Sequence, residues 1–193
     1  MLGLIGEAAD TSTTFSDYEL SESYHGINDS VDGGLFDIAK RNLIFNNFRS
    51  DVVANLLDGT FNSDVINSVS KSAWVKTVDA ANEAYRPGQF TTFAAYEYTS
   101  STEELGNLHR NVVFRGTHKL PAVPFSRLNS INPEGLWSWM DGLREQGIDS
   151  LAIPHNSNGS NGAMFAFTDW AGNTIDQEYA EQRMRNEPLV EIT

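Results

Sequence analysis

The chain has 193 residues, of which 40% are apolar and 20% charged, so it is long and apolar enough to bury a core and is not a disordered chain. Its 26 acidic residues outnumber 13 basic ones, for a formal charge of -13, which argues against a nucleic-acid partner because phosphate binding needs a basic face. Cysteine is absent, which excludes disulfides and thiolate metal sites, so any metal ligand has to be His, Asp, Glu or water.

Targeting and boundary features are sparse. No apolar run is long enough to span a bilayer, and the first residues lack the basic region of a signal peptide, so a soluble protein of open localisation is expected, with a parent that could be exported. Residues 2–6 are typical of a loop or of the tail of an element, and residues 188–193 resemble a strand without a closing turn. These ends predict an internal fragment of a longer protein.

The first half predicts a loop and two helices. Residues 11–34 are rich in Ser, Thr, Asp, Asn and Gly, which indicates a long loop. Apolar residues at three- and four-residue steps predict a helix over 35–57, with Phe36 and Leu43 on its apolar face. A second helix is predicted from Asp64, as its N-cap, to the Pro87–Gly88 pair.

The second half predicts strands that alternate with helices. Segments rich in β-formers indicate strands, and an Asn-Pro-Glu start at Asn132 indicates a helix that ends at Gly147. A polar helix is predicted over 176–185. Strands separated by helices or long links are typical of parallel βα units, so a single α/β domain over 1–193 is expected. The predicted strands are residues 90–98, 109–114, 150–154 and 189–192.

Candidate metal ligands follow from these strands. Glu97 and His155 lie at the carboxyl ends of their strands, where parallel sheets bind ligands, whereas His109 begins its strand and fits this rule less well. Each has an alternative interpretation, because a strand-end His is commonly structural and a strand-end Glu commonly caps a helix or pairs with Arg. The loop with Asn156 and Asn158 could cradle an anion or be an ordinary Gly-rich loop.

Five segments together resemble a known family. In order they are Tyr96–Ser100, Asn107–Gly116, Asn132–Asp141, Ala152–Asn158 and Asn186–Glu191. They are similar to the domain-of-unknown-function 3604 family, itself similar to the PHP (polymerase and histidinol phosphatase) metallohydrolases, and the resemblance covers most of residues 90–193.

The resemblance implies a partial, distorted βα barrel with mostly parallel strands. It makes Glu97 a bridging carboxylate, His109 and His155 imidazole ligands, and Glu191 an acidic strand position. Manganese, zinc or iron would suit such ligands. The His-x-His, Asp-His and Asp-x-His patterns of PHP enzymes are missing here, so incomplete metal binding and very slow hydrolysis are expected of this chain.

The function expected from the sequence is metal-dependent hydrolysis of a small-molecule phosphate ester. No catalytic residue is assigned, and Asn156, Asn158 and Glu191 are candidates for supporting the ligands or touching substrate. The alternative is a non-catalytic binding or structural remnant of the same fold. Open strand edges in a partial barrel would favour a homo-oligomer.

Overall fold

A computed structural model describes residues 34–57, 63–102 and 106–192. The predicted loop over 11–34 lies outside the described residues, apart from Gly34. The chain divides into two compact units, Met1–Lys76 and Thr77–Thr193, and each is considered by itself. None of the helices within the described ranges is long and apolar enough to cross a lipid bilayer.

The helices of the N-terminal half agree with the prediction in their extents. Helix α3 spans Leu35–Leu57 and helix α4 spans Ser63–Ala84. Asp64 lies inside the first turn of α4 instead of capping it, where a carboxylate still complements the helix dipole. Phe36 is 89% exposed, so the apolar face predicted for α3 is not buried there.

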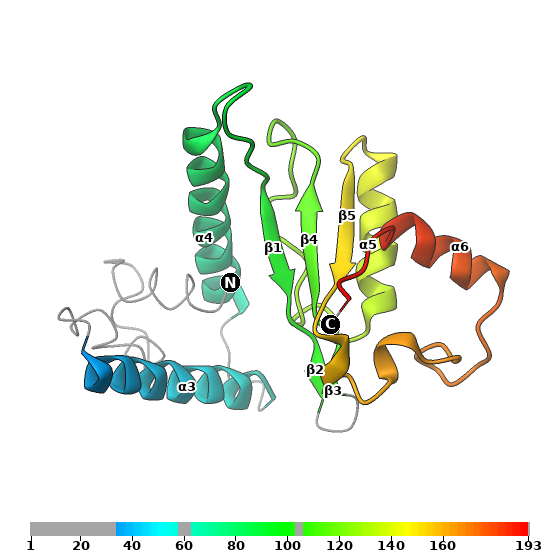
Figure 1. Cartoon of the computed structure of the whole chain (residues 1–193), viewed down its shortest axis with the longest axis horizontal. Coiled ribbons are helices and arrows are strands. Elements are labelled where there is room, and N and C mark those ends of the chain that lie inside the picture. The colour runs from blue at the N-terminus through cyan, green and yellow to red at the C-terminus, as the bar shows by residue number, and fades with distance from the viewer. Residues whose placement is uncertain (1–33, 58–62, 103–105, 193) are drawn as a thin grey trace. The chain divides into compact units, whose positions relative to one another are not determined.

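The sheet is antiparallel, and the predicted parallel barrel is therefore wrong. Strands β1 (Ala95–Tyr98), β4 (Arg110–Phe114) and β5 (Ser150–Pro154) pair in the order β1-β4-β5, every neighbour antiparallel. Figure 1 shows the arrow of β4 pointing opposite to those of β1 and β5. A two-stranded ribbon, β2 (Ser101–Thr102) with β3 (Gly106–Asn107), joins β1 to β4, and within the described residues the sheet does not close.

The path between β4 and β5 explains why an intervening helix did not produce parallel strands. After β4 the chain first returns to the opposite end of the sheet, where the Tyr98 hydroxyl donates to the Ser130 carbonyl over 2.7 Å. Helix α5 (Pro133–Glu145) then runs back, and β5 begins opposite Phe114. Two strands are parallel when the link between them returns the chain to the end of the sheet where the first strand began. Here the link returns to that end and then runs back along α5, so β5 begins where β4 ended and the two strands are antiparallel.

The predicted first strand is also too long. Only Ala95–Tyr98 forms β1, and Phe90 and Phe93 are each 58% exposed instead of buried on both faces. Residues 86–90 form a turn closed by a bridge between Arg86 and Phe90. The apolar content of this segment therefore did not identify a strand buried along its whole length.

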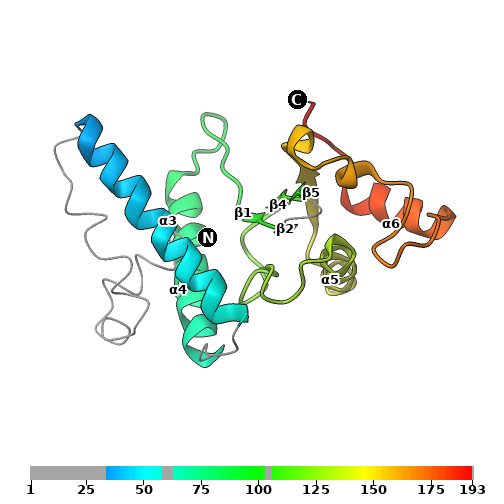
Figure 2. The same cartoon turned by 90° about the horizontal axis from the view of Figure 1, so that it is seen from below.

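One face of the sheet carries the core. Alternate residues of each strand point to the same face, and this face is buried beneath α5, which Figure 2 shows on one side of the strands. Helix α5 begins as predicted, with the Asn132 side chain accepting from the Glu134 N–H over 2.9 Å, and Trp137 is 1% exposed. The buried strand residues are Tyr96, Tyr98, Arg110, Val112, Phe114, Ala152 and Pro154.

The C-terminal segment differs from the prediction. Helix α6 spans Gln177–Asn186, one residue later at each end than predicted, because Asp176 is its N-cap and accepts from the Tyr179 N–H. The strand predicted over 189–192 does not form, and one backbone hydrogen bond, from the Glu191 N–H to the Pro154 carbonyl at 3.0 Å, joins this segment to β5. Pro188 has no N–H to donate to a neighbouring strand, and Leu189 and Ile192 are exposed instead of packed in a core. The apolar residues of this segment therefore did not indicate a strand.

A buried carboxylate ties α6 to the sheet and to α5. The Glu187 side chain, 2% exposed, accepts from Arg110 Nε at 2.8 Å, from Trp137 Nε1 at 2.7 Å and from Arg183 Nε at 3.0 Å. Arg110 is equally buried and also donates to the Leu108 carbonyl. Buried charges are tolerated only when paired and hydrogen-bonded in this way.

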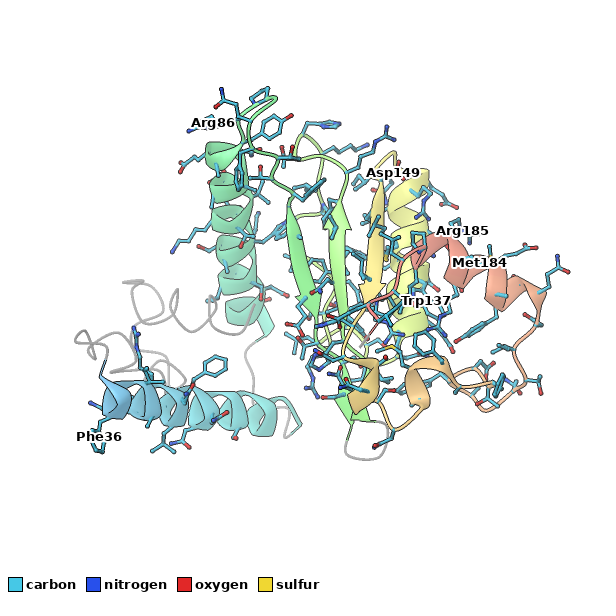
Figure 3. All side chains as sticks on the ribbon, viewed as in Figure 1. Phe36, Arg86, Trp137, Asp149, Met184 and Arg185 are labelled. Atoms are coloured by element: carbon cyan, nitrogen blue, oxygen red, sulfur yellow. The ribbon has the colours of Figure 1, made fainter. Side chains whose placement is uncertain are left out.

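A second polar cluster joins α5 to α6 nearer the surface. Asp141 on α5 accepts from Arg185 and Asn186 on α6 and from Arg144 on its own helix, at 2.7–3.0 Å. Figure 3 labels Arg185 on α6 and Trp137 on α5. Hydrogen bonds from Arg185 lower the pKa of Asp141 well below its usual range, burial opposes that shift, and Asn186 and Gln182 add to it.

Removal of the Glu187 charge tests the buried cluster. Glu187→Gln leaves Arg110 and Arg183 without a counter-charge, and loss of one partner of a buried pair costs about 3–5 kcal/mol. We expect that loss of unfolding free energy in urea denaturation followed by tryptophan fluorescence. Glu145→Gln, an exposed change on α5, should alter stability by no more than about 0.5 kcal/mol. Equal stabilities for the two variants would contradict the assignment.

Acid titration tests the Asp141 cluster. Because the folded-state pKa of Asp141 is lowered, its contribution to stability is present above the unfolded-state pKa of about 4 and is lost as the pH falls through the folded-state value. Asp141→Asn should therefore lower the unfolding free energy most at pH 6–7, and the difference from wild type should shrink below about pH 4. The control is Asp79→Asn, an exposed change on α4, which should alter the unfolding free energy by no more than about 0.5 kcal/mol.

Candidate metal centre

Three predicted ligands meet at one edge of the sheet. Glu97 belongs to the carboxyl-terminal half of β1, His155 directly follows β5, and His109 directly precedes β4. Because β4 runs opposite to its neighbours, its beginning lies at the same edge as the ends of β1 and β5. The position of His109, which does not suit a parallel sheet, suits this antiparallel one.

The register also places these side chains on one face. Glu97 lies opposite Asn111, and His109 is two residues before Asn111, so Glu97 and His109 are diagonal neighbours on the same face. The His155 N–H donates to the His109 carbonyl over 3.3 Å, which continues the pairing of β4 with β5 by one residue. The three side chains therefore project from the face opposite the α5 core.

The distances within the cluster are short. His109 Nδ1 is 2.7 Å from Glu97 Oε1, and His155 Nε2 is 3.6 Å from the same oxygen. The two imidazole rings have centroids 5.7 Å apart. One donor atom from each of the three residues lies within 4.8 Å of those of the other two, a separation that one metal ion can bridge.

His155 presents an unsatisfied nitrogen to this cluster. Its Nε2 atom is buried and has no hydrogen-bond partner among the described residues, since Glu97 Oε1 lies beyond hydrogen-bonding distance. A buried polar atom left unpaired costs about 1–3 kcal/mol, so such atoms call for an explanation. A metal ion bound to Nε2 would satisfy it, and a carboxylate with two imidazoles is a donor set that divalent metals accept.

The environment of His109 favours its neutral form. Burial lowers the pKa of His109, the Glu97 carboxylate opposes that shift, and His155 adds to it. A neutral imidazole has a lone pair to offer a metal ion, whereas an imidazolium has none. The Glu97 side chain, 41% exposed, opens the cluster to solvent.

The supporting residues come from neighbouring loops. The Asn156 N–H donates to Glu191 Oε2 at 2.8 Å, and Asn156 Nδ2 lies 3.1 Å from His155 Nδ1. Asn158, also predicted as a supporting residue, is exposed in the short 3-10 helix η1 (Ser157–Gly159), and no hydrogen bond in the described residues joins its side chain to the three ligands.

Asn107 is a contributor for which no role was predicted. Its Oδ1 accepts from the His109 N–H at 2.9 Å and fixes the backbone where the histidine leaves the ribbon. The Asn-x-His pattern in the sequence could have indicated this hydrogen bond, because an Asn side chain often accepts from the N–H two residues later.

Gly106 brings the β2–β3 ribbon against the loop that follows His155. Its φ is +65°, and an added Cβ would lie 2.5 Å from the Gly159 carbonyl oxygen and 3.1 Å from the Ser160 carbonyl carbon. Both are backbone atoms, so the loop would have to move to make room. Only glycine permits this approach.

Gly106→Ala therefore tests whether this contact positions His155. We expect a loss of about 1 kcal/mol for the left-handed backbone and a further 1–3 kcal/mol for the clash, together with weaker metal binding. Gly88→Ala is the matched control, because Gly88 has a φ of +75° and open space around its Cβ position. Thermal unfolding and metal titration measure both effects. Equal losses in the two variants would show that the approach is unimportant.

Comparison with known proteins gives one match. The family described as protein of unknown function (DUF3604) matches residues 1–193, and so includes the N-terminal part in which the resemblance was weak. Neither a curated protein nor a solved structure matches the sequence. The three clustered residues lie in segments through which the resemblance to this family was identified. Since the match extends over all 193 residues, the chain belongs to the DUF3604 family.

Proposed function

We propose that Glu97, His109 and His155 bind one divalent metal ion and that the protein is a metal-dependent hydrolase of phosphate esters. The observation that carries this proposal is the convergence of one donor atom from each residue within 4.8 Å. The three come from separate strand ends, so their meeting is a property of the folded sheet and not of sequence proximity.

The number of donors favours a catalytic site over a closed structural one. Structural zinc sites have four protein ligands, whereas catalytic sites commonly have three and leave a position for water or substrate. Two imidazoles with one carboxylate are compatible with zinc, manganese or iron. The partly exposed Glu97 gives a small molecule access to the cluster.

A bound divalent ion would supply an acidified water and polarise a phosphoryl oxygen. The protein's own residues provide the rest: His109 and Glu97 are already hydrogen-bonded at 2.7 Å, so their geometry is set before any ligand arrives. A formal charge of -13 repels a phosphate ester but attracts cations. Recognition of a phosphate by this chain therefore needs a neutralising cation at the site.

The resemblance of the sequence to PHP metallohydrolases motivates the choice of phosphate esters. By that resemblance Glu97 would be a bridging carboxylate and the two histidines would be imidazole ligands. The further His and Asp pairs of PHP enzymes have no counterpart in these 193 residues. We accordingly propose that this chain binds a single ion and turns over slowly.

Calorimetric titration of the full chain with zinc and with manganese tests the metal site. We expect one ion per chain. His155→Ala should weaken binding by about 100-fold or more, since loss of groups that merely support a ligand already costs about 10–100-fold. His118→Ala, which removes an exposed histidine outside the cluster, should bind as wild type does. Absence of binding by the wild-type chain would overturn the proposal.

Hydrolysis of a generic phosphate ester separates catalysis from binding. We expect slow turnover that a chelator abolishes and that His155→Ala reduces in parallel with metal affinity. The measurement is product release from p-nitrophenyl phosphate and its diester, with His118→Ala as control. Tight metal binding without chelator-sensitive turnover would instead favour the alternative, a non-catalytic metal-binding protein.

A further inference from the structure

Asn156 touches the ring nitrogen of His155 that faces away from the cluster. His155 Nε2 faces Glu97, whereas its Nδ1 lies 3.1 Å from Asn156 Nδ2. In this arrangement the Asn156 amide donates to Nδ1, which places the single proton of a neutral imidazole on Nε2. That proton points towards the Glu97 carboxylate at 3.6 Å.

Metal binding requires the other tautomer. A metal ion takes a nitrogen lone pair, so Nε2 has to be bare and the proton has to be on Nδ1. An Nδ1–H in turn needs an acceptor. Asn156 has one, because rotation of its amide by half a turn replaces the Nδ2 donor with the Oδ1 acceptor in the same position.

We propose, as an inference that rests on the proposed metal site, that Asn156 is a positioning residue that serves both neutral tautomers of His155. Its amide donates to Nδ1 in the metal-free chain and accepts from Nδ1–H when Nε2 is committed to a metal ion. Loss of the Nε2 proton to solvent and uptake of one at Nδ1 leave the ring neutral throughout. The ring keeps a hydrogen bond, and therefore its orientation, in both states.

A clamp from the C-terminal segment holds Asn156 in place. Its φ is 54°, a left-handed conformation that Asn adopts more readily than most residues. The Asn156 N–H donates to Glu191 Oε2 at 2.8 Å, and the Glu191 N–H donates to the Pro154 carbonyl at 3.0 Å. These two bonds bracket His155 from the residues before and after it. Glu191 thus acts on the histidine through Asn156 and not by direct contact.

Substitutions at position 156 separate the two hydrogen-bonding roles. Aspartate keeps an acceptor and loses the donor, so Asn156→Asp should favour the Nδ1–H tautomer even without metal. Alanine keeps neither, so Asn156→Ala should leave the ring free to turn. The matched control is Asn161→Ala, because Asn161 has nearly the same backbone, with a φ of 53°, and is exposed.

Nitrogen NMR of the full-length, histidine-labelled chain reads the tautomer directly. Without metal we expect the Nε2–H tautomer for wild type and for Asn161→Ala, and the Nδ1–H tautomer for Asn156→Asp. Addition of zinc should convert wild type to Nδ1–H. Identical tautomers in metal-free wild type and Asn156→Asp would overturn the inference, and this comparison holds whether or not the chain binds metal.

Zinc titration provides the second measurement. Asn156→Ala should bind zinc about 10–100-fold more weakly than wild type, the usual effect of removing a group that orients a metal-binding histidine. Asn161→Ala should stay close to wild type, whereas Asn156→Asp, which already favours the Nδ1–H tautomer, should bind zinc at least as tightly as wild type. Glu191→Ala should weaken binding, whereas Glu191→Gln, which keeps an acceptor for the Asn156 N–H, should not. Wild-type affinity in Asn156→Ala alongside lost affinity in His155→Ala would refute the inference and leave the metal site standing.

Discussion

The carboxylate of Glu187 lies between two guanidinium groups in the interior, and the arrangement of the site depends on it. Arg110, its closest charged partner, is the residue after His109, and both members of the pair are 2% exposed. Because a buried charge without its partner is strongly destabilising, the side chains that pair with Glu187 are held in their present positions. The bond to Trp137 adds α5 to the same cluster. From Glu187 the chain continues to Glu191, whose carboxylate reaches Asn156 beside His155. Helix packing and ligand placement are thus connected along the chain, through the buried cluster at Glu187 and the exposed hydrogen bond between Glu191 and Asn156.

Strand direction is the second constraint. Composition located most of β4, β5 and α5 because β-formers, the Asn-Pro-Glu start and Gly147 act locally. Direction is not local: it depends on the link between β4 and β5, which crosses the sheet before α5 begins, and on the bond from Tyr98 to Ser130 that holds this return. The alternation of strands and helices was therefore compatible with parallel strands, and the prediction failed there. The strand prediction for 189–192 was also wrong, because the apolar residues of this segment are exposed and a single backbone hydrogen bond connects it to β5.

The candidate ligands and their grouping in one site were predictable from the sequence, but the strand arrangement that brings them together was not. Glu97 and His155 stood out as strand-end residues, and the family resemblance added His109, whose place at the start of a strand argued against it. The antiparallel register removes that conflict by bringing the start of β4 to the ends of β1 and β5. The hydrogen bond between Asn156 and Glu191 and the close approach of Gly106 to Gly159 depend on tertiary placement, so no local pattern could assign them. The bond from the His109 N–H to Asn107 is local, and the Asn-x-His pattern indicates it.

The central claim is that Glu97, His109 and His155 hold one metal ion, and a crystal of the full chain soaked in zinc tests it most directly. An anomalous difference map collected at the zinc absorption edge should contain one strong peak, within about 2.0–2.2 Å of a donor atom from each of the three residues. In a crystal of His155→Ala that peak should vanish or weaken greatly. A map with no peak at the cluster, or with zinc bound elsewhere while these side chains keep their present contacts, would contradict the account.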